Sequence, residues 1–99
     1  MTIREKIIEG LLTAGTERLE KLIELGAPTV IITGQQQYVE NLKRGEVKIA
    51  GEQNLLDIEF SSVEQKKGRG GKSYYSFNDD INFFPVTRYG NMYISRNNK

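Results

Sequence analysis

The 99-residue chain contains no cysteine and no histidine. The absence of cysteine excludes disulfide bonds, thiolate metal sites, cysteine nucleophiles and thiol redox switches. The absence of histidine removes the side chain most often used for proton transfer near neutral pH, and also the commonest metal ligand. No nucleophile–base pair is recognisable among the remaining residue types. The sequence therefore predicts a protein that is not an enzyme and that uses neither a cofactor nor a metal ion.

The sequence also lacks a long hydrophobic run and an excess of charge of either sign. No apolar stretch approaches the ~20 residues that a membrane-spanning helix needs, and the charged start at residues 4–6 is unlike a signal peptide. We therefore expect a cytoplasmic protein without membrane contact. Because 14 basic and 13 acidic residues leave a net charge of +1, any preference for nucleic acid has to come from a local basic patch.

What remains is ordinary globular composition, with 37% hydrophobic and 27% charged residues. A chain of this length can bury one core but not two independent ones. The sequence therefore predicts a single domain over residues 1–99.

The N-terminal third predicts a helix. Thr2 and Glu5 have the spacing of a capping box, which places the helix start near Ile3, and apolar residues then recur on one face as far as Ile23. Glycines at positions 10 and 15 each cost roughly 1 kcal/mol relative to alanine, so the helix is expected to be kinked or split in two at residues 14–16. Gly26 is expected to cap its end.

The rest of the chain predicts mostly strands. The β-branched run 29–33, between Pro28 and Gly34, predicts a strand buried on both faces. A short helix is expected over 35–44, and Pro85 places the strand that contains it at a sheet edge or a bulge. The further strands are expected at 47–50, 54–61, 73–77, 81–88 and 92–96, with a two-residue hairpin turn at Gly90-Asn91. This order predicts an α+β fold in which the helices pack on one face of a mostly antiparallel sheet of about five to six strands.

A glycine-rich, basic connection is the main candidate site. Its glycines lie at positions 68, 70 and 71 between two predicted strands, and neither their spacing nor the strand that follows fits a phosphate-binding loop. Three interpretations remain open: a solvated hairpin tip, a flexible finger that contacts an acidic protein surface, and a contact to a phosphate backbone in which a tyrosine stacks on a base. The side chains that would make these contacts are Lys66, Lys67, Arg69, Lys72, Tyr74 and Tyr75.

Aromatic residues gather in the C-terminal strands, and strand alternation can bury only part of them. The others either close a second small core or project from the far face of the sheet. Exposed tyrosine beside arginine, as at Arg88 and Tyr89, is favoured at protein interfaces. The aromatic set is Tyr74, Tyr75, Phe77, Phe83, Phe84, Tyr89 and Tyr93.

The first functional hypothesis is a small intracellular inhibitor or adaptor, of the kind found in phages and other mobile elements. It would occupy the surface of a larger protein, or protein–nucleic-acid complex, through the aromatic strands and the basic tip. The alternative is a nucleic-acid-binding protein that uses the Lys66–Lys72 loop. A homodimer also remains open, because the strand that contains Pro85 is expected at a sheet edge and the N-terminal helix is long and amphipathic.

Overall fold

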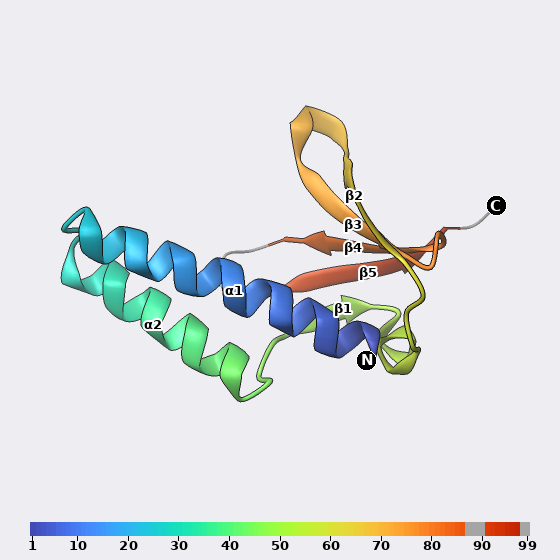
Figure 1. The fold of residues 1–99 in the computed structure, drawn as a ribbon, viewed down its shortest axis with the longest axis horizontal. Coiled ribbons are helices and arrows are strands. Elements are labelled where there is room, and N and C mark those ends of the chain that lie inside the picture. Colours follow the sequence, from blue (N-terminus) through green and yellow to red (C-terminus); the bar gives the residue numbers. More distant parts are fainter. Residues whose placement is uncertain (87–90, 98–99) are drawn as a thin grey trace. The chain divides into compact units, whose positions relative to one another are not determined.

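The computed structural model describes residues 1–86 and 91–97, which form two α-helices, five strands and two short 3-10 helices (Figure 1). Contacts divide the chain into two compact units, one of residues 6–47 and the other joining residues 1–5 to the chain from Lys48 onward. The predicted α+β class with a mostly antiparallel sheet is confirmed. No helix in the described ranges is long and apolar enough to cross a membrane.

Helix α1 spans Ile3–Glu24 without a break. It begins at the predicted capping residue, because the Glu5 N–H donates to Thr2 Oγ1 at 3.3 Å. The predicted kink or split at residues 14–16 is wrong. Gly15 lies against α2 instead, where a Cβ would come within 3.0 Å of the Tyr38 ring. The glycine thus allows a close helix–helix contact rather than ending the helix.

Helix α2 spans Thr29–Lys43, so the predicted buried strand at 29–33 is wrong. These residues form the first turns of the helix, and Val30 is 78% exposed. Its buried residues Gln35, Val39 and Leu42 recur at helical spacing, and packing of such a face outweighs the few tenths of a kcal/mol by which β-branched residues disfavour a helix. The predicted helix over 35–44 is the second half of α2.

Two polar groups mark the contact between α1 and α2. The buried Gln35 Nε2 donates to the Gly15 carbonyl at 3.0 Å. Burial raises the pKa of the Tyr38 hydroxyl, an effect that the charge of Arg18 opposes. Both helices then end on a glycine. Gly26, with φ +68°, donates to the Ile23 carbonyl while the next N–H reaches Leu22, and Gly45 closes α2 in the same way.

The five strands form one sheet in the order β1-β5-β4-β3-β2. The β1–β5 pair is parallel and the other three pairs are antiparallel. The outermost strands among the described residues are therefore β1 and β2. The strands are β1 Ile49–Gly51, β2 Val63–Lys67, β3 Ser73–Phe77, β4 Ile81–Pro85 and β5 Met92–Arg96.

Strand β4 lies inside the sheet, so the prediction that Pro85 marks an edge is wrong. Pairing of β4 with β3 stops at Phe83, whereas pairing with β5 continues to Pro85. The N–H of Val86 donates to Asn91, next to β5, and donors alternate sides along a strand. The nitrogen of Pro85 therefore faces the β3 side, beyond the last paired residue, and its missing N–H removes no bond from the sheet. The predicted turn at Gly90-Asn91 includes Gly90, which lies outside the described residues.

The predicted strand at 54–61 is also wrong. The chain forms a 3-10 helix at Gln53–Asp57, and the next strand begins only at Val63. Leu55 and Leu56 are both buried, which consecutive residues of a half-buried strand cannot achieve but neighbouring residues of a helical turn can. Phe60 lies beyond this turn, half-buried, with its ring edge-on to that of Phe77 at 6.1 Å.

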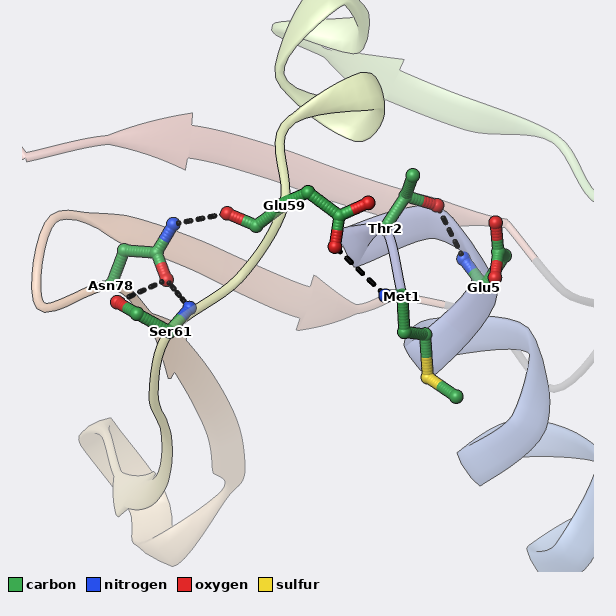
Figure 2. A network of polar contacts seen from close by, with 6 residues as sticks. All are labelled: Met1, Thr2, Glu5, Glu59, Ser61 and Asn78. Atoms are coloured by element: carbon green, nitrogen blue, oxygen red, sulfur yellow. Dashed lines mark hydrogen bonds and ion pairs between the residues drawn. The ribbon is translucent and has the colours of Figure 1, made fainter.

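The first three residues form hydrogen bonds with the segment that precedes β2 (Figure 2). Thr2 forms an isolated antiparallel bridge with Glu59, and the Ile3 N–H donates to the Ile58 carbonyl at 3.2 Å. The amino group of Met1 donates to Glu59 Oε2 at 2.8 Å. This bond and the charge of Glu59 raise the pKa of the amino group.

Asn78 holds the same segment against the turn after β3 (Figure 2). Its Oδ1 accepts bonds from the main-chain N–H and the hydroxyl of Ser61, and its Nδ2 donates to the Glu59 carbonyl at 3.2 Å. Its main-chain N–H donates to Ser62 at 3.0 Å. Asn78 and Asp79 both have positive φ, which asparagine and aspartate tolerate better than most residues, and residues 78–80 form the turn between β3 and β4.

Replacing Asn78 with alanine should lower the free energy of unfolding by about 2–3 kcal/mol, since the variant loses side-chain hydrogen bonds worth ~0.5–1.5 kcal/mol each and replaces asparagine with a residue that tolerates the left-handed region less well. Urea unfolding measures the change. Asn78→Gly is the matched control, because it loses the same bonds without the backbone strain and should be about 1 kcal/mol less destabilised. Equal stability of Asn78→Ala and wild type would show that this network contributes nothing.

Candidate interaction surface

The pleat of the sheet separates its side chains into two faces. Strand pairing brings the buried apolar residues together on one of them, which we call the core face. The opposite face carries three aromatic residues from neighbouring strands, which we call the aromatic row: Tyr74 of β3, Phe84 of β4 and Tyr93 of β5. The core face consists of Ile49, Phe77, Ile81, Phe83, Met92 and Ile94.

The rings of the aromatic row touch one another across the sheet. The centroids of Tyr74 and Phe84 are 5.0 Å apart with the ring planes 23° apart, and those of Phe84 and Tyr93 are 6.2 Å apart at 41°. Tyr93 is 46% exposed, and the other two rings are half-buried. Strand register extends the row to Ala50 on β1 and to Lys66 on β2. One line of side chains thus crosses all five strands and ends at a cation.

Two hollows adjoin the row, and Val86 lines both. The first, of about 340 Å³, lies between the hairpin tip and the end of β4, where Arg69 and Lys72 join Tyr74 and Phe84 in its wall. The second, of about 420 Å³, is lined by residues of β1 and β5, including Tyr93, and by Lys48. The row therefore has a hollow with basic residues in its wall toward each end.

The predicted basic hairpin is confirmed, with β2 as its first arm in place of residues 54–61. Its strands pair as far as Lys67 and Ser73, and the Gly68 N–H closes the loop by donating to the Lys72 carbonyl at 2.8 Å. Gly70 and Gly71 have φ of +71° and +74°. Such values are strained for residues with a Cβ, which explains the glycine content of the tip.

The structure separates the basic residues that the sequence grouped together. Arg69 and Lys72 belong to the tip, whereas Lys66 and Lys67 lie within β2. Register places Lys66 on the face of the aromatic row, next to Tyr74, and Lys67 on the core-face side. Three of the four predicted cations therefore lie beside the aromatic row or in the wall of its first hollow.

The two described tyrosines that the sequence predicted as contact residues also lie on different faces of the sheet. Tyr74 belongs to the row, but Tyr75 points to the core-face side, where its ring pairs with that of Phe83 at 6.1 Å. Arg88 and Tyr89 lie outside the described residues. Phe84 and Tyr93 were not predicted as contact residues, because only the pairing of strands distant in sequence brings them into line with Tyr74.

One acidic residue of the turn between β3 and β4 forms an exposed ion pair. Asp80 lies 3.7 Å from the guanidinium of Arg96, across the end of β4. Among the residues that the structure describes, no group of three or more acidic side chains is arranged to hold a metal ion.

A scan against protein-family models found no match, and searches of curated proteins and of solved structures found no significant similarity to this chain.

Proposed function

We propose that this chain is a protein-binding module that occupies the surface of a larger partner with its aromatic row and basic hairpin tip. It acts as an inhibitor or adaptor in the cytoplasm and catalyses no reaction. The observation that carries the proposal is the aromatic row, a line of two half-buried rings and the exposed Tyr93 on the sheet face opposite the core face.

The composition of the row supports a protein partner. Tyrosine and phenylalanine are enriched at the centres of protein interfaces, where they bury a large area with little loss of side-chain entropy. The half-buried rings are already held in place by one another and by strand pairing. Binding therefore costs little side-chain entropy, so more of the contact energy contributes to the affinity.

The hollows and their basic residues define what such a partner must present. An apolar side chain of the partner fits the wall formed by Tyr74, Phe84 and Pro85. Acidic groups of the partner would meet Arg69 and Lys72 at one end and Lys48 at the other. The partner surface is therefore apolar at its centre and acidic at its rim, and the rim charges should mainly raise the association rate.

Nucleic acid is the second candidate, favoured by the position of Lys66 at the end of an aromatic row. Single-stranded nucleic acids bind by stacking bases on open ring faces. In this row the near-parallel rings of Tyr74 and Phe84 cover one another's faces. The net charge of +1 also gives little general attraction to phosphates. These two features favour the protein partner.

The proposal is tested by isolating the partner with wild-type protein and measuring its affinity for variants. Tyr93→Ala should weaken binding about 10–100-fold, because it truncates the most exposed ring of the row. Arg69→Ser with Lys72→Ser should slow association and reduce its salt dependence, with little change in the free energy of unfolding.

Tyr75→Ala is the matched control, since this tyrosine lies on the same strand as Tyr74 but points to the other face. It should leave the affinity within about threefold of wild type, below a difference of 1 kcal/mol. Equal losses for Tyr93→Ala and Tyr75→Ala would remove the row as the binding surface. Retention of nucleic acid alone, with no protein partner, would replace the proposal with the second candidate.

A further inference from the structure

Strand β2 forms an open edge of the sheet. It is the last strand in the order, so only β3 pairs with it in the part of the chain that the structure describes. All five of its residues, Val63–Lys67, are exposed, and none is proline. Figure 1 shows β2 and β3 as the two arms of the hairpin. A strand of this kind is a template for pairing with another chain.

The hydrogen bonds of the hairpin show which β2 groups face outward. The Gly68 N–H donates to Lys72, and the Asn78 N–H donates to Ser62. Bonded pairs alternate along an antiparallel ladder, so every second residue of the β2 segment, counted from these two pairs, bonds to β3. The main-chain groups of Val63, Gln65 and Lys67 therefore point away from the sheet, each offering one donor and one acceptor.

The other edge, β1, is protected by comparison. It has only three residues and ends at Gly51, with φ +85°. The Met92 N–H bonds to the Lys48 carbonyl, so the carbonyl of Ile49 faces outward, and the side chain of Gln53 donates to it. Short length is one common defence of an edge strand, and charged side chains are another. Strand β2 has five residues and carries charges of both signs, so it pairs well only with a strand whose charges match its own.

We propose that β2 pairs antiparallel with β2 of a second copy of this chain, about a two-fold axis at Gln65. The sequence of the strand is self-complementary in this register. Glu64 of each copy lies opposite Lys66 of the other, on the face of the aromatic row. Opposite charges that face each other across two strands stabilise the pairing, and like charges destabilise it.

The same register uses all the outward main-chain groups. Gln65 pairs with Gln65 of the second copy, and Val63 pairs with Lys67 in both directions, which makes about six hydrogen bonds. Within one copy, Glu64 Oε2 and Lys66 Nζ are 3.9 Å apart, and both side chains are exposed. Each side chain can therefore turn toward the second copy. An acidic strand of an unrelated protein would offer opposite charges to Lys66 and Lys67, but it would place a like charge opposite Glu64.

The dimer has a consequence for the aromatic rows. A two-fold axis between adjacent antiparallel strands is perpendicular to the sheet, so both copies show the same face on the same side. The two aromatic rows then lie side by side on one continuous sheet. A dimeric or repetitive partner would be bound by both rows at once, with the gain in avidity that this brings.

Sedimentation equilibrium of the full chain, up to about 1 mM, tests the proposal with charge reversals. Wild type should dimerise, while Glu64→Lys and Lys66→Glu should each weaken self-association at least about tenfold, because each sets like charges opposite each other in two places. An equimolar mixture of the two variants should dimerise as wild type does, because each restores the opposite charges of the other. Far-UV circular dichroism confirms that both variants fold.

A second measurement needs no variant. Amide hydrogen exchange at Val63, Gln65 and Lys67 should slow as the protein concentration rises, while exchange elsewhere on β2 stays constant. Gln65→Pro, which removes an outward N–H and leaves the β3 ladder intact, should give a monomer. A wild type that stays monomeric at about 1 mM, or variants that dimerise alone as strongly as when mixed, would overturn the proposal.

Discussion

Replacement of Gly51 with alanine is expected to destabilise the protein by more than about 3 kcal/mol, enough to unfold a small domain under many conditions. Gly51 ends β1 with φ +85°, a value that side chains rarely allow. A Cβ at this position would also overlap the carbonyl oxygen of Ile94 in the paired strand. That carbonyl accepts the Glu52 N–H at 3.1 Å, so it cannot move away without breaking the β1–β5 connection.

Guanidinium unfolding of Gly51→Ala measures this effect, and Gly10→Ala is its matched control. Gly10 lies inside α1 with nothing within 4 Å of a built Cβ. Alanine should therefore stabilise the protein there by about 0.5–1 kcal/mol, since it restricts the unfolded chain and favours the helix. Unfolding of Gly51→Ala at the wild-type denaturant concentration would contradict the described packing of β1 against β5.

Replacement of Phe83 with alanine should cost about 3–5 kcal/mol, as expected for a phenylalanine removed from a packed core. Phe83 is 2% exposed and lies on the core face beside Ile81 and Ile94, which are at most 1% exposed. The neighbouring Phe84 is the same residue type on the same strand, but it points to the aromatic row and is only half-buried. Phe84→Ala should therefore cost less than about half as much.

The two substitutions should rank in the opposite order for binding. Phe84→Ala, the less destabilising change, should weaken partner binding more than Phe83→Ala. Phe84→Ala removes the middle ring of the row and should abolish most partner binding in a protein that remains folded. Phe83→Ala should keep its partner affinity under conditions where it is folded. Chemical denaturation and calorimetric titration of both variants make this comparison. Equal destabilisation by the two changes would mean that the faces of β4 are wrongly assigned.

Local signals in the sequence predicted local structure well. The capping box at Thr2 and Glu5 and the glycine cap at Gly26 depend only on neighbouring residues, and both are confirmed. The strand at 73–77 is confirmed for the same reason. Hairpin pairing also follows from short-range order, since the glycine-rich connection leaves its two arms adjacent.

The errors arose where packing decided between two local preferences. The β-branched run 29–33 favours a strand on its own, but it continues into helix formers whose buried face begins at Gln35. Alternation at 54–61 suggested a strand, although two adjacent leucines had to be buried together. Such choices depend on contacts with distant residues, which intrinsic propensity does not contain.

The candidate surface needed long-range pairing even more. Its three rings come from three different strands, and strand β5 reaches the row only through its place in the sheet order. The sequence identified an aromatic cluster and a basic tip. Alternation within the expected strand 73–77 places the adjacent Tyr74 and Tyr75 on opposite faces, but it does not tell which of the two lies on the core face. Strand register, which no single segment fixes, made that distinction.

Site-specific photo-crosslinking tests most directly whether the aromatic row binds a protein. A photoreactive phenylalanine analogue at position 93 should attach the partner covalently, because this ring is at the exposed end of the row. The same analogue at position 30, on the exposed side of α2 in the other unit of the chain, should attach little or none. Strong crosslinking at 93 with none at 30 is the predicted result. Crosslinking at 30 but not at 93, by a partner that binds wild type, would contradict it.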